Sequence, residues 1–285
     1  MFEMKICVAG LGIIGGSICM ALKRAGHFVA GWNRSEKPVK YAFENKIIDE
    51  RAENFDYDVV FIALPPEITV NFINSQVFKD GSVVTDICGV KKFIEDSVYS
   101  QPRNFKYVGC HPMAGKEVSG IENACENLFD NANMVITRSD KTDKAALDLI
   151  KKLTAEMGFK YLVECSALTH DKKIAYTSQL AHIVSNAYVK NKEIDDCLHF
   201  TGGSFQDMTR IAGVDEEVWA DLYLKNADNL SKDIEILTDA LNELKDAIES
   251  RDRQNLVRIL QDGRGRFENC KNFVTDSDIF VQKLK

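Results

Sequence analysis

The sequence has little of what marks membrane-spanning, secreted or nucleic-acid-binding proteins. No run of about 18 apolar residues occurs, so no segment is predicted to span a membrane. The 36 basic residues are outnumbered by 43 acidic ones, and the net charge of −7 gives no general attraction to DNA, RNA or anionic membranes. Prolines number only 5, and 45% of the 285 residues are hydrophobic. This composition argues against disorder and suits two domains.

The N-terminus shows no signal peptide, and the cysteines show no metal or disulfide pattern. The chain begins MFEMKICVAG, which predicts a strand with no preceding basic region or cleavage site. None of the eight cysteines forms a C-x-x-C pair, and most lie within apolar runs. We therefore expect a cytoplasmic protein with reduced, mostly buried cysteines and no metal site.

The first part of the chain alternates between strand-like and helix-like runs. Strands are expected at residues 4–9, 27–32, 58–64, 82–87, 107–110, 133–137 and 160–164. Charged segments with helical spacing lie between several of them. This alternation predicts an α/β fold, with a mostly parallel sheet covered on both faces in a Rossmann-type, doubly wound domain.

The second part of the chain has helical periodicity and no strand-like runs. Residues 216–250 contain no glycine or proline and carry apolar residues at spacings of three and four. The pattern predicts one continuous helix of about 30 residues, about 45 Å long. Part of this stripe should contact another chain, so we expect a homodimer. The predicted boundary separates residues 1–164, a dinucleotide-binding domain, from residues 165–285, a helical substrate and dimerisation domain.

A glycine-rich loop follows the first predicted strand and opens the first helix. Residues 10–15 read GLGIIG, which has the G-x-G-x-x-G spacing of dinucleotide sites. Gly10 permits the tight turn, Gly12 lets the backbone approach a pyrophosphate, and Gly15 lets helix and strand pack closely. The first helical amides, at Ile13 and Ile14, would face the phosphates.

The residues after the second strand bear on the choice of dinucleotide. NAD sites usually place a carboxylate there, whereas this chain has Asn33, Arg34 and Ser35. Asn33 and Ser35 can donate hydrogen bonds, and Arg34 can pair with a 2′-phosphate. This favours NADP over NAD, the alternative for Arg34 being a solvated loop charge. Leu64 and Pro65, at the end of the third strand, complete the predicted cofactor site.

Four side chains outside the loop are candidates for substrate chemistry. His111 ends a predicted strand, where ligands bind in open α/β sheets, and its imidazole can accept a proton near neutral pH. His182 lies three residues after Gln179 in a helical run, so the two share a face. Arg210 follows a glycine-containing turn and could either bind a substrate carboxylate or form an ordinary ion pair.

Taken together, these segments resemble the prephenate/arogenate dehydrogenase family of tyrosine biosynthesis. The resemblance covers nearly the whole chain, and its motifs occur in order. They are the loop at 10–16, HPMAG at 111–115 with Glu117 after it, HD at 170–171, SQLAH at 178–182, FQDMTRIA at 205–212 and WAD at 219–221. The resemblance implies a helical, dimerising second domain. It implies oxidative decarboxylation of prephenate to 4-hydroxyphenylpyruvate, or of its amino analogue arogenate to tyrosine, with NAD(P)+ as acceptor.

The resemblance also implies roles, and the chain departs from the family in three places. His111 matches the catalytic base, Arg210 the arginine that binds a substrate carboxylate, and His182 a second active-site histidine, with Gln179 beside it. Gly89 stands where the family has a serine that hydrogen-bonds the catalytic histidine. Gln179 replaces a histidine of the usual S-H-L-P-H motif, and Lys116 replaces a small hydroxyl residue.

Two other functions stay open at this point. A 3-hydroxyacid dehydrogenase shares the glycine loop and would use a lysine in the first interdomain helix, where Lys172 and Lys173 lie. That assignment leaves the HPMAG segment unexplained. A non-catalytic dinucleotide-binding regulator is favoured only by Gly89, because the retained His111, His182 and Arg210 argue for turnover.

Overall fold

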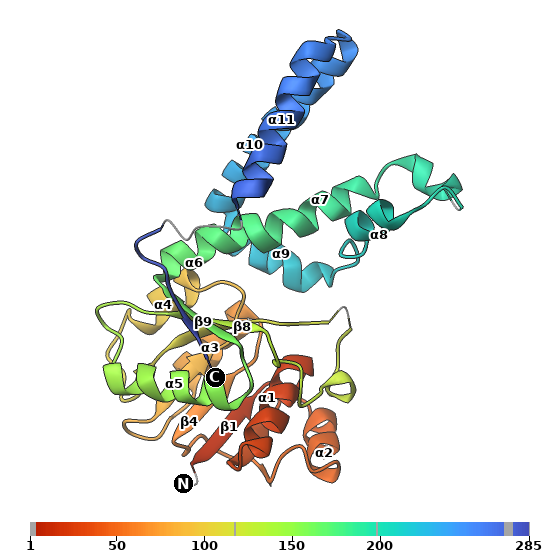
Figure 1. Cartoon of the computed structure of the whole chain (residues 1–285). Coiled ribbons are helices and arrows are strands. Elements are labelled where there is room, and N and C mark those ends of the chain that lie inside the picture. Colours follow the sequence, from red (N-terminus) through yellow and green to blue (C-terminus); the bar gives the residue numbers. More distant parts are fainter. Residues whose placement is uncertain (1–3, 117, 198, 271–275, 285) are drawn as a thin grey trace.

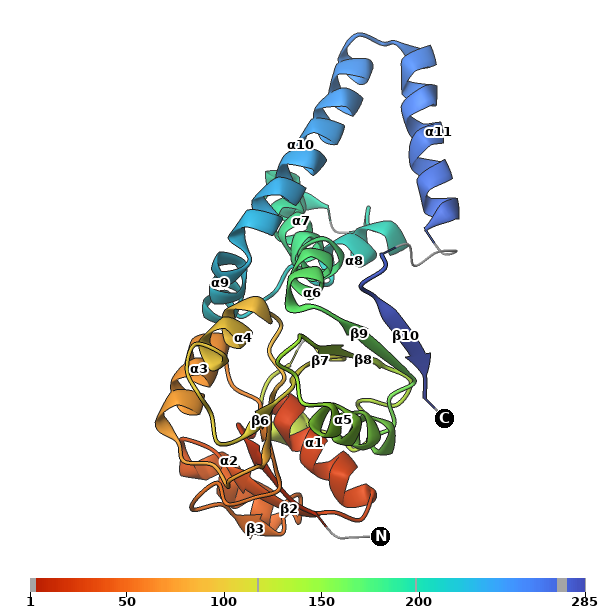
Figure 2. The ribbon, with the colours of Figure 1, turned by 90° about the vertical axis from the view of Figure 1, so that its left-hand side faces the viewer.

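The computed structural model describes residues 4–116, 118–197, 199–270 and 276–284 of the chain. A two-sheet body formed mainly by the first half carries an array of helices formed by the second half (Figure 1). Two of these helices project from the body as a long hairpin (Figure 2). No helix within the described ranges is long and apolar enough to cross a membrane.

The first sheet is parallel and has the strand order β3-β2-β1-β4-β5-β6. This is the order of a dinucleotide-binding fold, with the crossover between β1 and β4. The expected doubly wound domain is therefore confirmed. Its strands are β1 (Lys5–Ala9), β2 (Phe28–Trp32), β3 (Glu50–Arg51), β4 (Val59–Ile62), β5 (Val83–Asp86) and β6 (Lys106–Tyr107).

Helices cover both faces of this sheet because successive strand residues point in opposite directions. Ile6 and Val8 of β1 belong to one apolar cluster, whereas Cys7 and Ala9 belong to the other. The first cluster includes α1 (Ile13–Arg24), α2 (Glu36–Glu44) and α5 (Lys144–Glu156), and the second includes α3 (Pro66–Ser75) and α4 (Lys92–Val98).

A second, mixed sheet lies beside the parallel one, whereas the sequence predicts one mostly parallel sheet. Its order is β10-β9-β8-β7, with β8 and β9 parallel and the outer pairs antiparallel. The run expected at 107–110 is divided, because it ends β6 and begins β7. Strand periodicity is the same in either sheet, so the sequence could not reveal this division. The strands are β7 (Gly109–Met113), β8 (Asn133–Thr137), β9 (Tyr161–Cys165) and β10 (Phe280–Lys283), and a short 3₁₀ helix, η1 (Ile121–Asn123), lies between β7 and β8.

The second half begins with one long, interrupted helix that leads away from the sheets. A π-helical turn lies in its middle, a feature often found at functional sites. The elements are α6 (Ala167–Ile174), the π turn η2 (Ala175–Gln179), α7 (Leu180–Tyr188), η3 (Lys192–Asp196), α8 (Gly203–Thr209), α9 (Glu216–Lys225), α10 (Ala227–Glu249) and α11 (Arg253–Asn269).

The single helix predicted over residues 216–250 is wrong, because the structure breaks it at Asn226. This residue has a non-helical ψ of 24° and is buried. Its Nδ2 donates to the carbonyl of Asp171 at 2.8 Å and to Oε1 of Gln179 at 2.8 Å. These two tertiary hydrogen bonds stabilise the break, although the sequence has no glycine or proline there.

The last described strand returns to the body of the molecule. β10 pairs with β9, and Asp278 accepts a hydrogen bond from the Ser166 amide at 2.8 Å (Figure 2). The sequence predicts no strand in this part of the chain. Residues 280–283 are all exposed in the structure, so they lack the alternation of apolar and polar residues that marks a half-buried strand. The predicted domain boundary at 164/165 falls within β9, which ends at Cys165.

Candidate active site

The loop at residues 10–15 has the geometry that a dinucleotide needs. Gly10 has a φ of +101°, and a Cβ there would lie 2.2 Å from the carbonyl oxygen of Ala63. A Cβ on Gly15 would lie 1.9 Å from the Gly10 oxygen, so neither position accepts a side chain. A Cβ on Gly12 would meet open space, which leaves room for a phosphate. The N-cap residue Gly12 makes no side-chain hydrogen bond to the first turn of α1, so it leaves the amides of this turn available for a phosphate.

The cleft at this loop continues along the carboxyl ends of β1, β4 and β5. Its volume is about 330 Å³. Ile13, Ile14, Leu64 and Pro65 line it, as predicted for the cofactor site. The loop, the uncapped helix and this apolar wall together fit a dinucleotide.

The three residues after β2 have different surroundings. Asn33 accepts a hydrogen bond from the Leu11 amide at 3.1 Å, and its Nδ2 donates to Ser35 Oγ at 3.0 Å. Asn33 therefore stabilises the phosphate loop itself. Arg34 and Ser35 are exposed, and Arg34 forms no ion pair within the described ranges. The Arg34 guanidinium is thus available for an anion near the expected ribose.

His111 lies in β7, next to the carboxyl end of β5. Its Nδ1 lies 2.8 Å from Nε2 of His170, which is in α6 of the helical half. A Cβ added at Gly89 would lie 3.7 Å from Nε2 of His111. Gly89 lines the cofactor cleft, so the outer nitrogen of His111 lies next to a residue of that cleft.

A buried ion pair lies behind His111. Lys91 donates to the carboxylate of Asp86 and, at 2.5 Å, to the carbonyl of Cys110, and both charged side chains are fully buried. Tyr107 donates to the second oxygen of Asp86 at 2.5 Å. Every charge in this group is matched, which is how a buried pair is tolerated.

Burial lowers the pKa of His111 well below its ordinary value of 6.5, and the nearby His170 and Lys91 act in the same direction. The imidazole is therefore neutral at neutral pH and can accept a proton. The neighbouring thiol of Cys88 is different, because burial raises its pKa and keeps it protonated.

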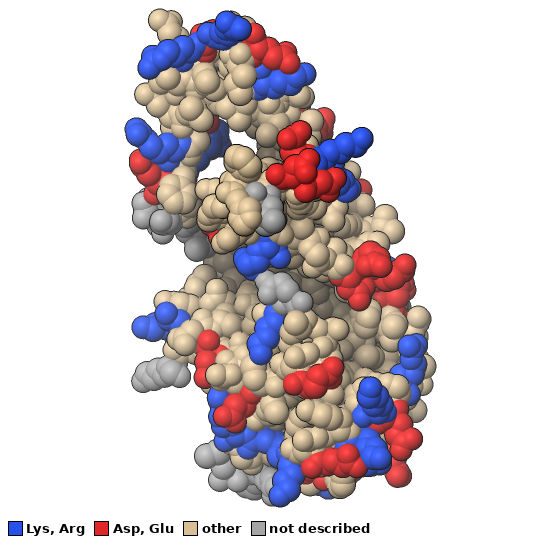
Figure 3. All heavy atoms as spheres, turned by 90° about the vertical axis from the view of Figure 1, so that its right-hand side faces the viewer, with Lys and Arg blue, Asp and Glu red and all other residues tan. Residues whose placement is uncertain are grey.

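A second cleft, of about 590 Å³, lies beside the first and shares Val118 and Ser119 with it. His182 and Arg210 both line this second cleft, together with Trp219 and Lys116. Nδ1 of His182 lies 2.9 Å from the carbonyl of Ile211, so it carries the proton, and the ring packs on Trp219 at 3.9 Å between centroids. Figure 3 shows basic side chains on this face where the two halves of the molecule meet.

The structure places Gln179 away from both clefts. Its side chain is buried, and its Nε2 lies 3.4 Å from the carbonyl of Leu222. Its oxygen accepts from Asn226, so both ends of the amide contact the α9–α10 junction. The shared face predicted for Gln179 and His182 assumed α-helical spacing, whereas Gln179 ends the π turn η2.

The sequence interpretation missed several residues. His27 is buried, and its Nε2 lies 2.8 Å from Glu156. Trp219 was noted only as part of a motif, yet it packs on His182. No local signal distinguishes these residues, because their partners are distant in the chain. Glu117, part of the quoted motif, lies outside the described residues.

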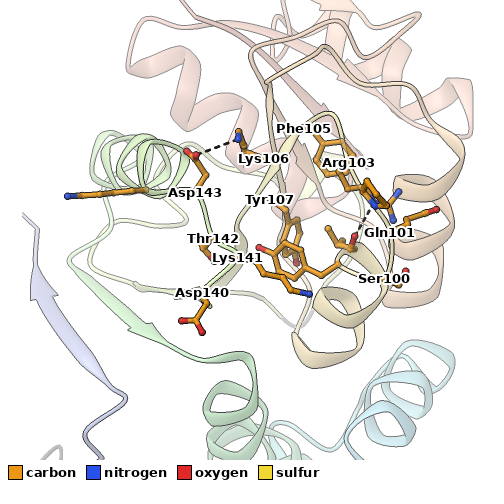
Figure 4. A pocket seen from close by; sticks show the side chains of 14 residues that line it. Ser100, Gln101, Arg103, Phe105, Lys106, Tyr107, Asp140, Lys141, Thr142 and Asp143 are labelled. Carbon is orange, nitrogen blue, oxygen red and sulfur yellow. Dashed lines mark hydrogen bonds and ion pairs between the residues drawn. The ribbon is translucent and has the colours of Figure 1, made fainter.

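A further cavity, of about 770 Å³, lies on another part of the body (Figure 4). Its wall comes from the segment between α4 and β6 and from the start of α5. Lys106 pairs there with Asp143 at 3.6 Å, and Lys141 lies over the Tyr99 ring at 5.2 Å. These contacts neutralise part of its charge, and we assign no chemistry to it.

Comparison with known proteins identifies the family. The model for the nucleotide-binding domain of prephenate dehydrogenase matches residues 18–163, and the model for its dimerization domain matches residues 166–262. The chain belongs to the prephenate dehydrogenase family. Family membership makes it an oxidoreductase of the NAD(P)-dependent dehydrogenase class.

Relatives named for the two related substrates resemble the whole chain. Prephenate dehydrogenase of Bacillus subtilis is 32% identical over 276 residues, which cover 90% of this chain and 74% of the relative. The Aquifex aeolicus prephenate dehydrogenase, crystallised with hydroxyphenyl propionate and NAD+, is 29% identical with a TM-score of 0.81, covering 94% and 99% of the two chains. Synechocystis arogenate dehydrogenase is 27% identical with a TM-score of 0.76, covering 93% and 99%.

Family membership removes the 3-hydroxyacid dehydrogenase alternative. In addition, Lys172 and Lys173 are both exposed, and Lys173 lies 3.6 Å from Asp276. Neither lysine lines the two clefts described above.

The lowered pKa of His111 predicts the pH dependence of the dehydrogenase. If His111 is the catalytic base, as the sequence analysis expects, kcat/KM falls as the pH falls through that pKa, because the protonated imidazole cannot accept a proton. The midpoint of this acid limb is expected below pH 6.5. The measurement is kcat/KM against pH. A midpoint at or above 6.5 would show that His111 is not the group that titrates.

Proposed function

We propose that this chain oxidises and decarboxylates prephenate to 4-hydroxyphenylpyruvate, with NADP+ as the preferred acceptor. The observation that carries this proposal is the position of His111. Its Nε2 lies next to Gly89, which lines the dinucleotide cleft, and that cleft meets the cleft lined by Arg210 at Val118 and Ser119. This arrangement supports the proposal that a base and a carboxylate-binding arginine act beside a hydride-acceptor site.

The proposed mechanism assigns one task to each residue. Nε2 of His111 accepts the proton of the ring 4-hydroxyl as the carbonyl forms. A bound nicotinamide would supply the two-electron acceptor. Arg210 binds a carboxylate of the substrate, and His182, held by Ile211 and Trp219, lines the same cleft. The C4–H bond of the substrate breaks and gives up its hydride. The ring carboxylate then leaves as CO2, its bonding electron pair enters the ring, which becomes aromatic, and the former carbonyl oxygen takes up a proton to become the phenol.

Gly89 occupies the position of the family serine, next to the proposed base. A Cβ at this position would be 3.7 Å from Nε2 of His111 and 3.4 Å from Leu222, which is ordinary contact. We infer that the space next to Nε2 is open to a water molecule, which could replace the hydroxyl. This supports turnover rather than a non-catalytic regulator.

Arogenate is the second candidate substrate. It carries an amino group where prephenate carries a keto group. Synechocystis arogenate dehydrogenase matches this chain about as extensively as the Aquifex enzyme does.

We also propose the expected division between residues 1–164, which bind the cofactor, and 165–285, which bind substrate and the second subunit. We also propose a cytoplasmic location, as the sequence analysis expects.

Replacing the base tests the reaction. Wild-type protein should reduce NADP+ or NAD+ with prephenate or arogenate, and His111→Asn should lower kcat by about 10²–10⁴ because the general base is lost. The measurement is absorbance of the reduced cofactor in four parallel reactions, with His27→Gln as a control for replacement of a buried histidine elsewhere. Dinucleotide binding without turnover in any wild-type reaction would instead support the regulator.

Replacing Arg34 tests the cofactor preference. Arg34→Ala should weaken NADP+ binding about tenfold or more, because a charge-assisted hydrogen bond to the 2′-phosphate is lost, and should leave NAD+ binding unchanged. Titration calorimetry measures both constants, and Lys37→Ala, a nearby exposed lysine, is the control. An equal loss for both cofactors would contradict a 2′-phosphate contact.

The projecting hairpin supports a homodimer. Apolar side chains on α10 and α11 are exposed in the single chain, including Leu241 at 56% and Leu260 at 59%. Burying such a side chain contributes about 1.5–3 kcal/mol. We expect sedimentation at twice the chain mass, and a shift toward monomer in Leu260→Asp but not in Val77→Asp, an exposed site on the body. A monomeric wild type would exclude this dimer.

A further inference from the structure

We propose that His170, held by Asp171, is a positioning residue that sets which nitrogen of His111 carries the proton. The proposal rests on the proposed function, in which His111 accepts a proton at Nε2. It concerns a chain of three side chains that run from α6 to the cleft. The distances are 2.8 Å from His111 Nδ1 to His170 Nε2 and 2.7 Å from His170 Nδ1 to Asp171 Oδ1.

The direction of every hydrogen bond in this chain follows from Asp171. Its Oδ1 accepts from the Lys91 amide at 2.8 Å and its Oδ2 from the Lys92 amide at 2.9 Å. Both oxygens therefore already face donors, as an ionised carboxylate requires, and the remaining bond to His170 must be donated by the ring.

The two histidine tautomers then follow in turn. A neutral His170 that donates from Nδ1 has an unprotonated Nε2, which can only accept. The neighbouring Nδ1 of His111 must donate to it. His111 therefore has its proton on Nδ1 and its lone pair on Nε2, the atom next to Gly89 and the cofactor cleft.

The surroundings favour a neutral His170. The side chain is 2% exposed, and burial lowers its pKa although Asp171 opposes this. Lys91 adds a positive charge nearby, and its own ion pair is with Asp86. A protonated His170 would be a second cation close to Lys91, which would be unfavourable.

A second buried histidine, which contacts a carboxylate far from the proposed active site, serves as a comparison. His27 also contacts a carboxylate, that of Glu156 at 2.8 Å. Its other nitrogen, Nδ1, is buried without a hydrogen-bond partner in the described part of the chain. His170 differs because both of its nitrogens are engaged, and the second one contacts the proposed base.

The direct test is ¹⁵N NMR of histidine-labelled protein, with the His111 signals identified from the His111→Asn variant. At pH 7 wild-type His111 should be protonated at Nδ1 and unprotonated at Nε2. Asp171→Asn should raise the Nε2-protonated fraction, because its amide can donate to His170 and reverse the chain. An Nε2-protonated His111 in the wild type would by itself overturn the proposal, whatever the variants do.

Two replacements of His170 separate positioning from folding. Gln can extend its amide oxygen to the place of Nε2, whereas Asn reaches only the place of Nδ1. We expect His170→Asn to lower kcat with prephenate by about tenfold or more with KM within about threefold, and His170→Gln to retain more activity. His27→Gln, measured alongside, should leave kcat and the tautomer of His111 unchanged.

The outcomes distinguish the two proposals. An active His111→Asn would contradict the proposed function itself. If His111→Asn is inactive while both His170 variants keep kcat within about threefold and His111 keeps its tautomer, His111 is the base and the positioning role is wrong.

Discussion

The carboxylate of Asp171 is the contact on which the rest of the site depends. It accepts from two amides at the start of α4 and from His170, while its own backbone carbonyl accepts from Asn226. One residue of the helical half thus fixes a helix of the first half, the break between α9 and α10, and the histidine next to the proposed base. Two backbone amides and an imidazole satisfy a carboxylate that would otherwise be costly to bury.

This arrangement explains why the two halves form one active site. The cofactor cleft belongs to the parallel sheet, and His182, Arg210 and Trp219 belong to the helical half. The position of His111 relative to both depends on how α6 packs against α4. Lys225, which ends α9, also contacts Glu67 of α3 at 2.5 Å, so a second contact lies on the same side of the interface.

Sequence reasoning predicted the parallel sheet, its order of elements and the glycine loop, because these depend on local periodicity and on backbone space. The sequence also proposed His111 as the end of a strand and Arg210 as part of a glycine-containing turn. The structure instead places His111 inside β7 and Arg210 at the end of α8, and their roles stay predictions. The mixed sheet, the break at Asn226 and the burial of Gln179 were not predicted. Each depends on a partner far along the chain, such as Asp171 for Asn226, and no local pattern records such a partner. The resemblance to a family supplied residue roles that spacing alone could not.

The return of β10 to the sheet has a mechanical consequence for the helical half. This half leaves the body after β9 and comes back in the strand that pairs with β9, so both of its connections are anchored at one edge of the same sheet. Asp278 reinforces this attachment through the Ser166 amide. The start and the end of the helical half are therefore held at neighbouring strands of one sheet, whereas the hairpin tip formed by α10 and α11 lies far from both attachments.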